Sequence, residues 1–248
     1  MRYFMDISYK GTSFHGWQIQ PNGITVQEEI EKGLKLLLKE EIGITGSGRT
    51  DTGVHAKQQI AHFDTNKDLD SQDFAYKLNS YFAEDISIRK IRKVDEEASA
   101  RFSAVSRTYH YHIHQHKDPS VLGQSYFFKP KLNVSEINKA CKILLNWENF
   151  ECFSKVHTEV NHFHCNITFA KWYRIGPKNL FVITANRFLR GMVRAIVGTL
   201  IEVGLEKMTL EEFQAILESN DRKQAGRAVP AVGLFLQEVK YPDNIYLD

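Results

Sequence analysis

Residues 45–56 read Thr-Gly-Ser-Gly-Arg-Thr-Asp-Thr-Gly-Val-His-Ala, so three glycines fall within one short stretch. Glycine allows positive φ angles and lets another chain or a ligand approach the backbone closely, which an ordinary connecting turn seldom requires. A guanidinium at Arg49, a carboxylate at Asp51 and an imidazole at His55 are crowded among these glycines. The stretch therefore predicts a loop shaped for chemistry.

The residues around this loop predict a first unit of β-α-β-β-α-β order. Short strand-like runs at 41–45 and 58–64 flank the loop, which makes it a β–β connection. The rest of the first half supplies a strand over 2–9, a helix from a Thr25 capping box to about residue 39, a helix capped at Asp70 or Ser71, and a strand over 86–94. This order is typical of a ferredoxin-like unit.

The second half repeats the same order. It supplies a strand over 105–116, a helix over 134–145, hairpin strands over 166–175 and 180–185, a helix over 187–203, an extra helix from the Thr209 capping box, and a closing strand over 233–241. We therefore expect an α+β protein with ferredoxin-like units at 1–104 and 105–248. No low-complexity linker separates them, so the units should pack together, with mainly antiparallel sheets around a central cleft.

A phosphate-binding role for the glycine loop is disfavoured by its spacing. The loop has neither the G-x-x-x-x-G-K-[ST] pattern nor G-x-G-x-x-G at the start of a helix. Asp51 at its centre would also repel a phosphate unless a metal lay between them. The remaining alternative is a glycine-rich hairpin in which Asp51 has no role.

The loop resembles a family signature. Residues 48–56 are similar to the G-R-T-D-x-G-V-H-A motif of the tRNA pseudouridine synthase A family. Further similar elements follow in order along nearly the whole chain: Phe14-His15-Gly16-Trp17-Gln18-Ile19-Gln20, Ala100-Arg101-Phe102-Ser103-Ala104 with Arg107-Thr108-Tyr109, Met192-Val193-Arg194-Ala195-Ile196-Val197-Gly198, and Gly233-Leu234-Phe235-Leu236.

This resemblance implies a function and a set of site residues. A member of the family would convert uridine to pseudouridine in the anticodon stem-loop of tRNA, as a homodimer and without a metal or nucleotide cofactor. The resemblance makes Asp51 the catalytic carboxylate and Tyr109 the active-site tyrosine. It implies that Arg194 pairs with Asp51 and that Leu234 lines the uridine pocket. Arg49 stands next to Asp51 on the loop, where it could hold a phosphate or occupy the space that the uridine leaves; a surface arginine without a role is the alternative.

Three arginines of the predicted helix over 187–203 share one face. Arg187, Arg190 and Arg194 stand at i, i+3 and i+7, opposite an apolar stripe. A solvated polar face explains Arg187 and Arg190 equally well. For Arg194 the resemblance favours an active-site role, in which a short approach would hold Asp51 ionised.

Tyrosines and histidines alternate in the predicted strand over 105–116. Tyr109 and Tyr111 should share one face, while His110, His112, His114 and His116 point to the other. No carboxylate or cysteine is interleaved with these histidines, so we expect a solvated or weakly cationic face rather than a metal site. Ordinary packing also explains the His162-Phe163-His164-Cys165 run better than metal binding does.

Composition sets the remaining limits. A length of 248 residues with 42% hydrophobic and 12% aromatic residues is sufficient for well-packed cores. A net charge of +2 is too small to indicate nucleic-acid binding by itself, so any RNA-binding charge must be clustered locally. There is no long apolar run or leader, and the three cysteines form no C-x-x-C pair. We expect a cytoplasmic protein with no membrane span.

Two other functions compete with the synthase. A non-catalytic RNA-binding protein could use two ferredoxin-like units as stacking platforms, but no RNP1-type string is present. A metal-dependent nuclease could use Asp51 and His55, but it would need further carboxylates nearby.

Overall fold

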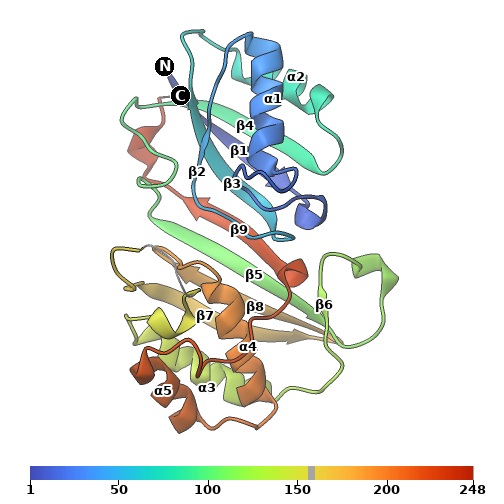
Figure 1. The fold of residues 1–248 in the computed structure, drawn as a ribbon, viewed down its shortest axis with the longest axis vertical. Coiled ribbons are helices and arrows are strands. Elements are labelled where there is room, and N and C mark those ends of the chain that lie inside the picture. Colours follow the sequence, from blue (N-terminus) through green and yellow to red (C-terminus); the bar gives the residue numbers. More distant parts are fainter. Residues whose placement is uncertain (156–159, 248) are drawn as a thin grey trace. The chain divides into compact units, whose positions relative to one another are not determined.

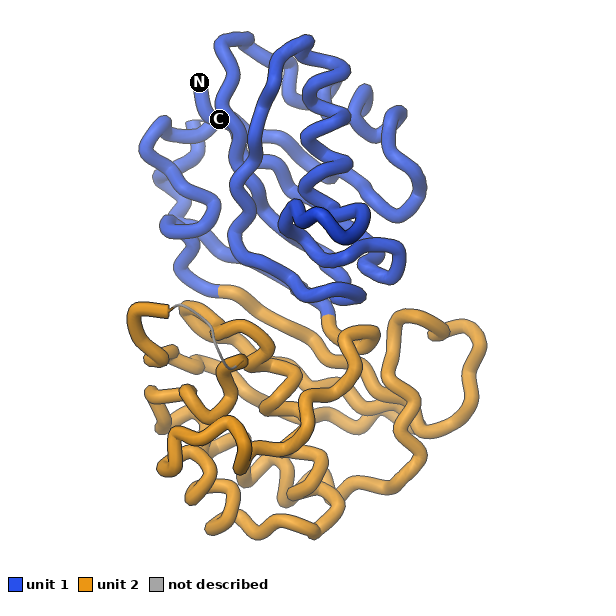
Figure 2. Tube along the Cα trace, in the orientation of Figure 1, with its two compact units in different colours: residues 1–106, 235–248 blue, residues 107–234 orange. Residues whose placement is uncertain are grey.

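The computed structural model describes residues 1–155 and 160–247. The chain forms two compact units, which are coloured separately in Figure 2. Unit 1 contains residues 1–106 and 235–248, and unit 2 contains residues 107–234. The fold is α+β, and most of its strand pairs are antiparallel, as the sequence predicted.

Unit 1 has the predicted β-α-β-β-α-β order. Its elements are β1 (Arg2–Tyr9), α1 (Val26–Leu38), β2 (Thr45–Gly46), β3 (His55–Asp64), α2 (Ser71–Tyr81) and β4 (Ile86–Val94). The strands are ordered β4-β1-β3, and β2 pairs with β3. Figure 1 shows α1 lying across these strands with α2 beside it. The result is the strand order of a ferredoxin-like unit.

The apolar side chains whose spacing predicted these elements are buried, as expected. In β1, Tyr3 and Met5 point into the core and are almost fully buried. The apolar stripe of α1 is also buried; it consists of Val26, Ile30, Leu34 and Leu38. Thr25 caps α1 by accepting the Glu28 N–H, and Asp70 caps α2 by accepting two N–H groups. Local capping and periodicity therefore account for both helices.

Unit 2 is built mainly on antiparallel strands. Its elements are β5 (Ser106–His114, whose first residue belongs to unit 1), β6 (Tyr126–Phe127), α3 (Val134–Leu145), β7 (Ile167–Ile175), β8 (Lys178–Ala185), α4 (Met192–Gly204) and α5 (Leu210–Ser219). The order is β5-β8-β7, and β6 pairs in parallel with β5. The extra helix α5 begins at a complete Thr209–Glu212 capping box. No helix in the described part of the chain has the length and hydrophobicity needed to span a bilayer.

The start of α4 differs from the prediction. The helix begins at Met192 rather than at Arg187, because Gly191 at its N-cap adopts a left-handed conformation with φ of 73°. Arg187 and Arg190 therefore precede the helix, and the predicted face of three guanidiniums is wrong. Arg194 alone of the three lies in α4.

The C-terminal strand β9 (Leu234–Lys240) pairs with a strand of unit 1, whereas the sequence predicted it in the second unit. It pairs in parallel with the start of β3, so Phe235 lies opposite His55. The tail beyond it returns to β4, where Tyr246 forms a bridge with Val94 and the Asp95 N–H binds the Ile245 carbonyl. Residues 235–248 therefore belong to unit 1, whereas the sequence assigned them to the second unit.

Contacts of Tyr246 in the C-terminal tail should stabilise unit 1, and this can be tested. The guanidinium carbon of Arg92 lies 3.3 Å from the centre of the Tyr246 ring, and the Phe4 ring meets Tyr246 edge to face at 6.3 Å. We expect Tyr246→Ala to lower the free energy of unfolding by about 1–2 kcal/mol. Urea denaturation would measure this change. Tyr76→Ala, at an exposed site on α2, is the control; equal losses in the two variants would contradict this assignment.

Candidate active site

The glycine loop connects β2 to β3 in unit 1, and its base is fixed on β3. The Ser47 N–H donates to the Ile60 carbonyl at 2.7 Å, and the fully buried Gln59 donates from Nε2 to the Gly48 carbonyl at 2.8 Å. Arg49 is exposed at the loop's tip. The loop is therefore held at its base while its charged residues remain accessible.

Asp51 begins a tight turn. Its carbonyl accepts the Val54 N–H at 3.1 Å, and Gly53 within this turn has φ of 79°. That conformation favours glycine at the third position of such a turn. Asp51 itself is partly buried. The turn thus holds the backbone of Asp51 while its side chain keeps some access to the surface.

The other two loop glycines differ from each other. A Cβ at Gly46 would lie 2.6 Å from the Trp17 indole, so this glycine permits close packing. A Cβ at Gly48 would meet no atom within 4 Å. The sequence analysis predicted that the three glycines allow close approach or a positive φ. This holds for Gly46 and Gly53. Nothing in the structure explains Gly48.

A second segment of unit 1 supports the residue before Asp51. The Thr50 carbonyl accepts the Trp17 N–H at 3.2 Å, and the Thr50 hydroxyl lies 2.8 Å from the Tyr9 hydroxyl. Gly16 packs so closely that a Cβ there would lie 2.6 Å from the Thr50 carbonyl oxygen. The Phe14–Gln20 element thus packs against the glycine loop. It contacts the backbone directly before Asp51.

His55 is packed in the interior of unit 1. It is buried, its Nδ1 accepts the Gly11 N–H at 3.1 Å, and its ring stacks on Phe235 at 4.4 Å.

Among residues 1–155 and 160–247, no group of three or more His, Cys, Asp or Glu side chains could hold a metal ion. Burial also raises the pKa of the Cys165 thiol to about 11, which disfavours the thiolate that a metal would require. The nuclease hypothesis therefore gains no support.

Unit 2 carries three of the other residues that the sequence singled out. Tyr109 on β5 meets Phe188 edge to face at 5.1 Å. Arg194 on α4 donates from Nε to the Val229 carbonyl at 2.8 Å, and the Val229 N–H returns to the Arg194 carbonyl at 3.1 Å. Leu234 is buried where β9 begins. The Arg194 side chain is therefore oriented by a hydrogen bond from its Nε to the backbone of Val229.

The tyrosine and histidine faces of β5 are only partly as expected. Tyr111 is buried, and its hydroxyl donates to the Pro230 carbonyl at 2.7 Å. On the other face, His114 is buried beside the Ser125 hydroxyl at 3.0 Å, and burial lowers the pKa of His110. A solvated histidine face is therefore wrong for His114, because the 115–131 segment folds back and places β6 beside β5.

Four supporting residues were not found from the sequence: Tyr9, Gln59, Phe188 and Val229. Each acts through a contact between segments that are distant in sequence. Of these four, only Tyr9 could be expected to be buried from the sequence, because it lies on the apolar face of the strand predicted over 2–9. A buried polar residue such as Gln59 has no periodic signature.

Comparison with known proteins identifies the family. The model of the tRNA pseudouridine synthase family matches residues 6–103 and 140–242, which is most of the chain. The chain belongs to this family. The family's members are isomerases that convert uridine to pseudouridine in tRNA. The matched ranges include the glycine loop, Arg194 and Leu234, whereas Tyr109 lies between them.

Full-length relatives within this pseudouridine synthase family are similar over nearly the whole chain. The tRNA pseudouridine synthase A of Parabacteroides distasonis is 46% identical over 99% of this chain and 98% of its own length. The protein of the same name from Bacteroides thetaiotaomicron is 44% identical, over 99% of this chain and 92% of its own. The one from Bacillus subtilis is 39% identical, over 98% of this chain and its whole length.

Proposed function

We propose that this chain converts uridine to pseudouridine in the anticodon stem-loop of tRNA, with Asp51 as the catalytic carboxylate. The observation that carries the proposal is the family's G-R-T-D motif on a loop whose backbone is fixed around Asp51. A carboxylate held in this way is available without rearrangement of the chain. Such pre-organisation is what a catalytic group requires.

The reaction needs no change of oxidation state. The N1–C1′ bond of uridine breaks, the base turns, and C5 bonds to C1′; C5 loses a proton and N1 ends with one. Asp51 acts either as a nucleophile or as a base on the ribose. Tyr109 stacks on the uracil and can assist removal of the C5 proton. We propose no cofactor, because the carboxylate and a proton acceptor account for every bond made or broken.

Two further residues of unit 2 and one of unit 1 complete the proposed site. The resemblance assigns Arg194 to the Asp51 carboxylate, and in unit 2 its Nε contact with Val229 fixes the stem of the side chain. Leu234 supplies an apolar wall for the base. Arg49 is exposed on the loop of Asp51, so it can bind a phosphate or fill the space that the uridine leaves. A base inside a stem must leave its stack before a carboxylate can reach the ribose.

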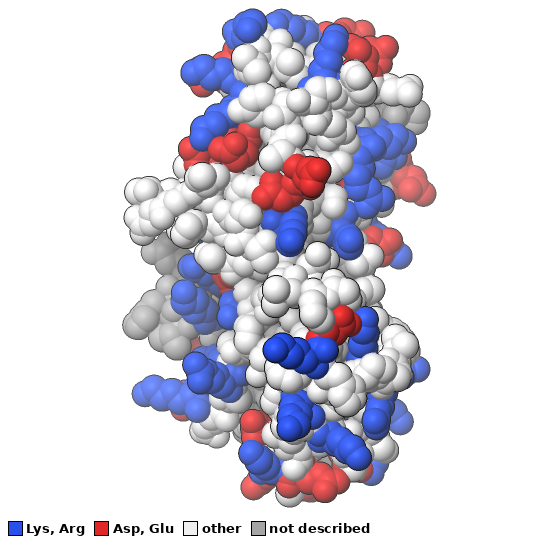
Figure 3. All heavy atoms as spheres, turned by 90° about the vertical axis from the view of Figure 1, so that its right-hand side faces the viewer, with Lys and Arg blue, Asp and Glu red and all other residues white. Residues whose placement is uncertain are grey.

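Surface cations are compatible with a polyanionic substrate. On the face drawn in Figure 3, Lys and Arg side chains are spread over the surface, with Asp and Glu side chains among them. Exposed cations of this kind attract a nucleic acid by releasing its counterions.

Tritium release distinguishes the proposed reaction from binding alone. Uridine labelled with tritium at C5 loses the label only when C5 forms the new bond to C1′. We expect the protein to release tritium from labelled tRNA, and mapping of the product should place pseudouridine in the anticodon stem-loop. A protein that binds tRNA without release would be a non-catalytic RNA-binding protein.

We further propose a cytoplasmic homodimer. The three cysteines are all free and buried, which agrees with a reducing compartment. Sedimentation equilibrium should give twice the monomer mass at micromolar concentration. A monomer that remains fully active would contradict the dimer proposal.

Tyr109→Phe separates the two roles proposed for Tyr109. The ring remains, so the KM for tRNA should change by no more than a few-fold. Loss of the hydroxyl should lower turnover by about 100-fold if that group assists proton removal. Single-turnover kinetics would measure the step, with Tyr111→Phe on the same strand as the control. Undiminished turnover in Tyr109→Phe would leave stacking as the only role.

A further inference from the structure

The Ala100–Ala104 element contains a bulky apolar side chain that the protein leaves in solvent. Phe102 is 81% exposed, and Val105 next to this element is 53% exposed. The guanidinium carbon of Arg101 lies 5.2 Å from the centre of the Phe102 ring, and Arg101 is also exposed. Apolar side chains exposed singly are common on protein surfaces, but here Phe102, Val105 and the Arg101 guanidinium are neighbours on one exposed stretch of chain.

The turn that presents Phe102 is held by its own hydrogen bonds. The Ser103 N–H donates to the Ser99 carbonyl at 3.0 Å, and the Phe102 N–H donates to the Ser99 hydroxyl at 3.3 Å. The Ser99 N–H in turn donates to the Ser103 hydroxyl at 2.9 Å. These three bonds fix the backbone on both sides of Phe102, so the backbone does not need to be ordered when a partner binds.

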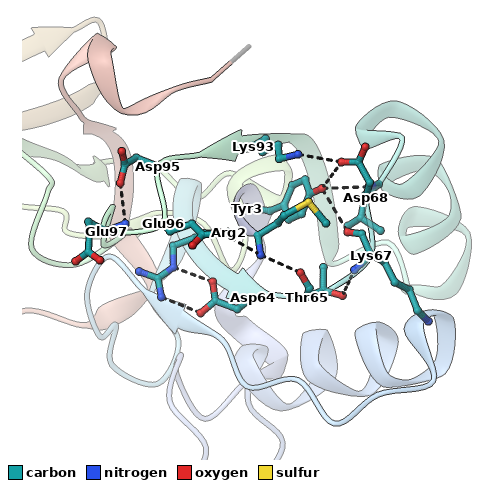
Figure 4. Close-up of polar contacts among 12 residues, drawn as sticks. Arg2, Tyr3, Asp64, Thr65, Lys67, Asp68, Lys93, Asp95, Glu96 and Glu97 are labelled. Carbon is teal, nitrogen blue, oxygen red and sulfur yellow. Dashed lines mark hydrogen bonds and ion pairs between the residues drawn. The ribbon is translucent and has the colours of Figure 1, made fainter.

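Unit 1 also fastens this turn to its sheet. The Ala100 N–H donates to His62 Nδ1 at 3.1 Å, and its carbonyl accepts the Tyr241 hydroxyl at 2.5 Å. Arg2 donates to the Ala98 carbonyl at 3.0 Å. Figure 4 shows the cluster beside this attachment, where Arg2 binds both oxygens of Asp64. A polar turn with an exposed phenylalanine is therefore attached to β1, to β3 and to Tyr241 directly after β9.

Two acidic residues near the turn have cationic partners, while the exposed Asp95 and Glu97 also precede the turn. Glu96 lies 3.5 Å from the N-terminal ammonium, and Asp64 lies 2.8 Å from Arg2. These contacts are drawn in Figure 4. They reduce the repulsion that an approaching polyanion would meet beside Arg101.

Asp51 and this turn are attached at opposite ends of β3. The tight turn of Asp51 leads into β3 at His55, whereas the Ala100–Ala104 turn is attached near the other end of the strand at His62. The strand between the two spans roughly 20 Å. A ligand on Phe102 is therefore not the target uridine.

We propose that Arg101 and Phe102 bind an unpaired nucleotide of the tRNA, distant from the uridine that is modified. The base stacks on the open face of the Phe102 ring, and the Arg101 guanidinium pairs with a phosphate. Aromatic rings bind exposed bases in this way because every base offers a π-face, and an adjacent arginine contributes charge and cation–π energy. This inference rests on the proposed function, since it assigns a second contact to the same substrate.

The test compares variants of Phe102 on full-length tRNA. Phe102→Ala should raise the KM by about 5- to 150-fold and leave kcat within about twofold, because stacking on a remote base affects binding and not chemistry. Phe102→Tyr should retain wild-type KM, and Phe102→Leu should not restore it. Tyr76→Ala, which removes an aromatic ring that is 72% exposed on α2, is the matched control and should leave KM unchanged.

Two further measurements identify the ligand. Arg101→Gln should reduce the slope of log Kd against log salt by about one, as expected for one lost phosphate contact. On a short anticodon stem-loop, which lacks the remote nucleotide, wild type and Phe102→Ala should have the same KM. An equal loss on both substrates would overturn a remote contact.

The remaining outcomes separate this inference from the proposed function. If the wild-type protein releases no tritium from tRNA, the proposed function fails. If the wild type is active and Phe102→Ala has an unchanged KM, only the present inference fails. Dissociation of a wild-type dimer by Phe102→Ala would also overturn it, because a second copy of the chain would then be what covers the ring.

Discussion

Asp51→Asn should abolish pseudouridine formation. Asparagine keeps the size of the side chain but cannot act as an anionic nucleophile or as a base, so no route to breaking the N1–C1′ bond remains. The loop should keep its conformation, because its bonds at Asp51, Thr50 and Gly48 are made by backbone groups or by neighbouring side chains. We expect turnover to fall below the detection limit of the tritium-release assay.

Binding of tRNA should survive this substitution. One neutral amide in place of a carboxylate removes no phosphate contact, so the Kd for tRNA should remain within a few-fold of the wild-type value. Asp70→Asn is the control: it removes one carboxylate from the same unit, and asparagine also caps helices well. Substantial turnover in Asp51→Asn would exclude Asp51 from the mechanism.

The sequence predicted most helices and strands of both units because the determining signals are local, although the run at 41–45 forms a strand only at Thr45–Gly46 and β6 was not predicted. Periodic burial and capping residues specify α1, α3 and α5, and the observed bounds of α3 are the predicted ones. The start of α4 was missed for an equally local reason. Helical spacing of side chains does not reveal that Gly191 adopts a positive φ, and this single residue excludes Arg187 and Arg190 from the helix.

Long-range packing explains the other differences. The return of residues 235–248 to unit 1 depends on parallel pairing of β9 with β3, and a strand pattern does not specify its partner. The burial of His114 similarly depends on the fold of the segment that follows it. Asp51 itself could be identified because its motif is contiguous. Its supports could not, since Tyr9 reaches the loop from β1 and the contact of Gln59 depends on how β3 folds back beside the loop.

Arg194→Ala should lower turnover by about 100-fold or more. Leaving a partly buried charge without its partner typically costs ~3–5 kcal/mol, and the proposed partner of Arg194 is the catalytic carboxylate. Arg194→Lys keeps a positive charge but loses the planar fork and the Nε donor that binds Val229, so its turnover should lie between wild type and Ala. Turnover should be measured at saturating tRNA, so that weaker binding does not contribute.

The contact with Val229 gives Arg194 a structural role that the experiment must separate from catalysis. Loss of that one hydrogen bond should cost about 1 kcal/mol of stability in both the Ala and the Lys variants. If Arg194 only held Val229, the two variants would lose turnover equally, in proportion to their loss of folded protein. Because Lys retains a charge that can meet a carboxylate, a higher turnover for Lys than for Ala at equal stability requires an electrostatic role. Arg174→Ala, which removes an exposed guanidinium from β7, should leave turnover unchanged.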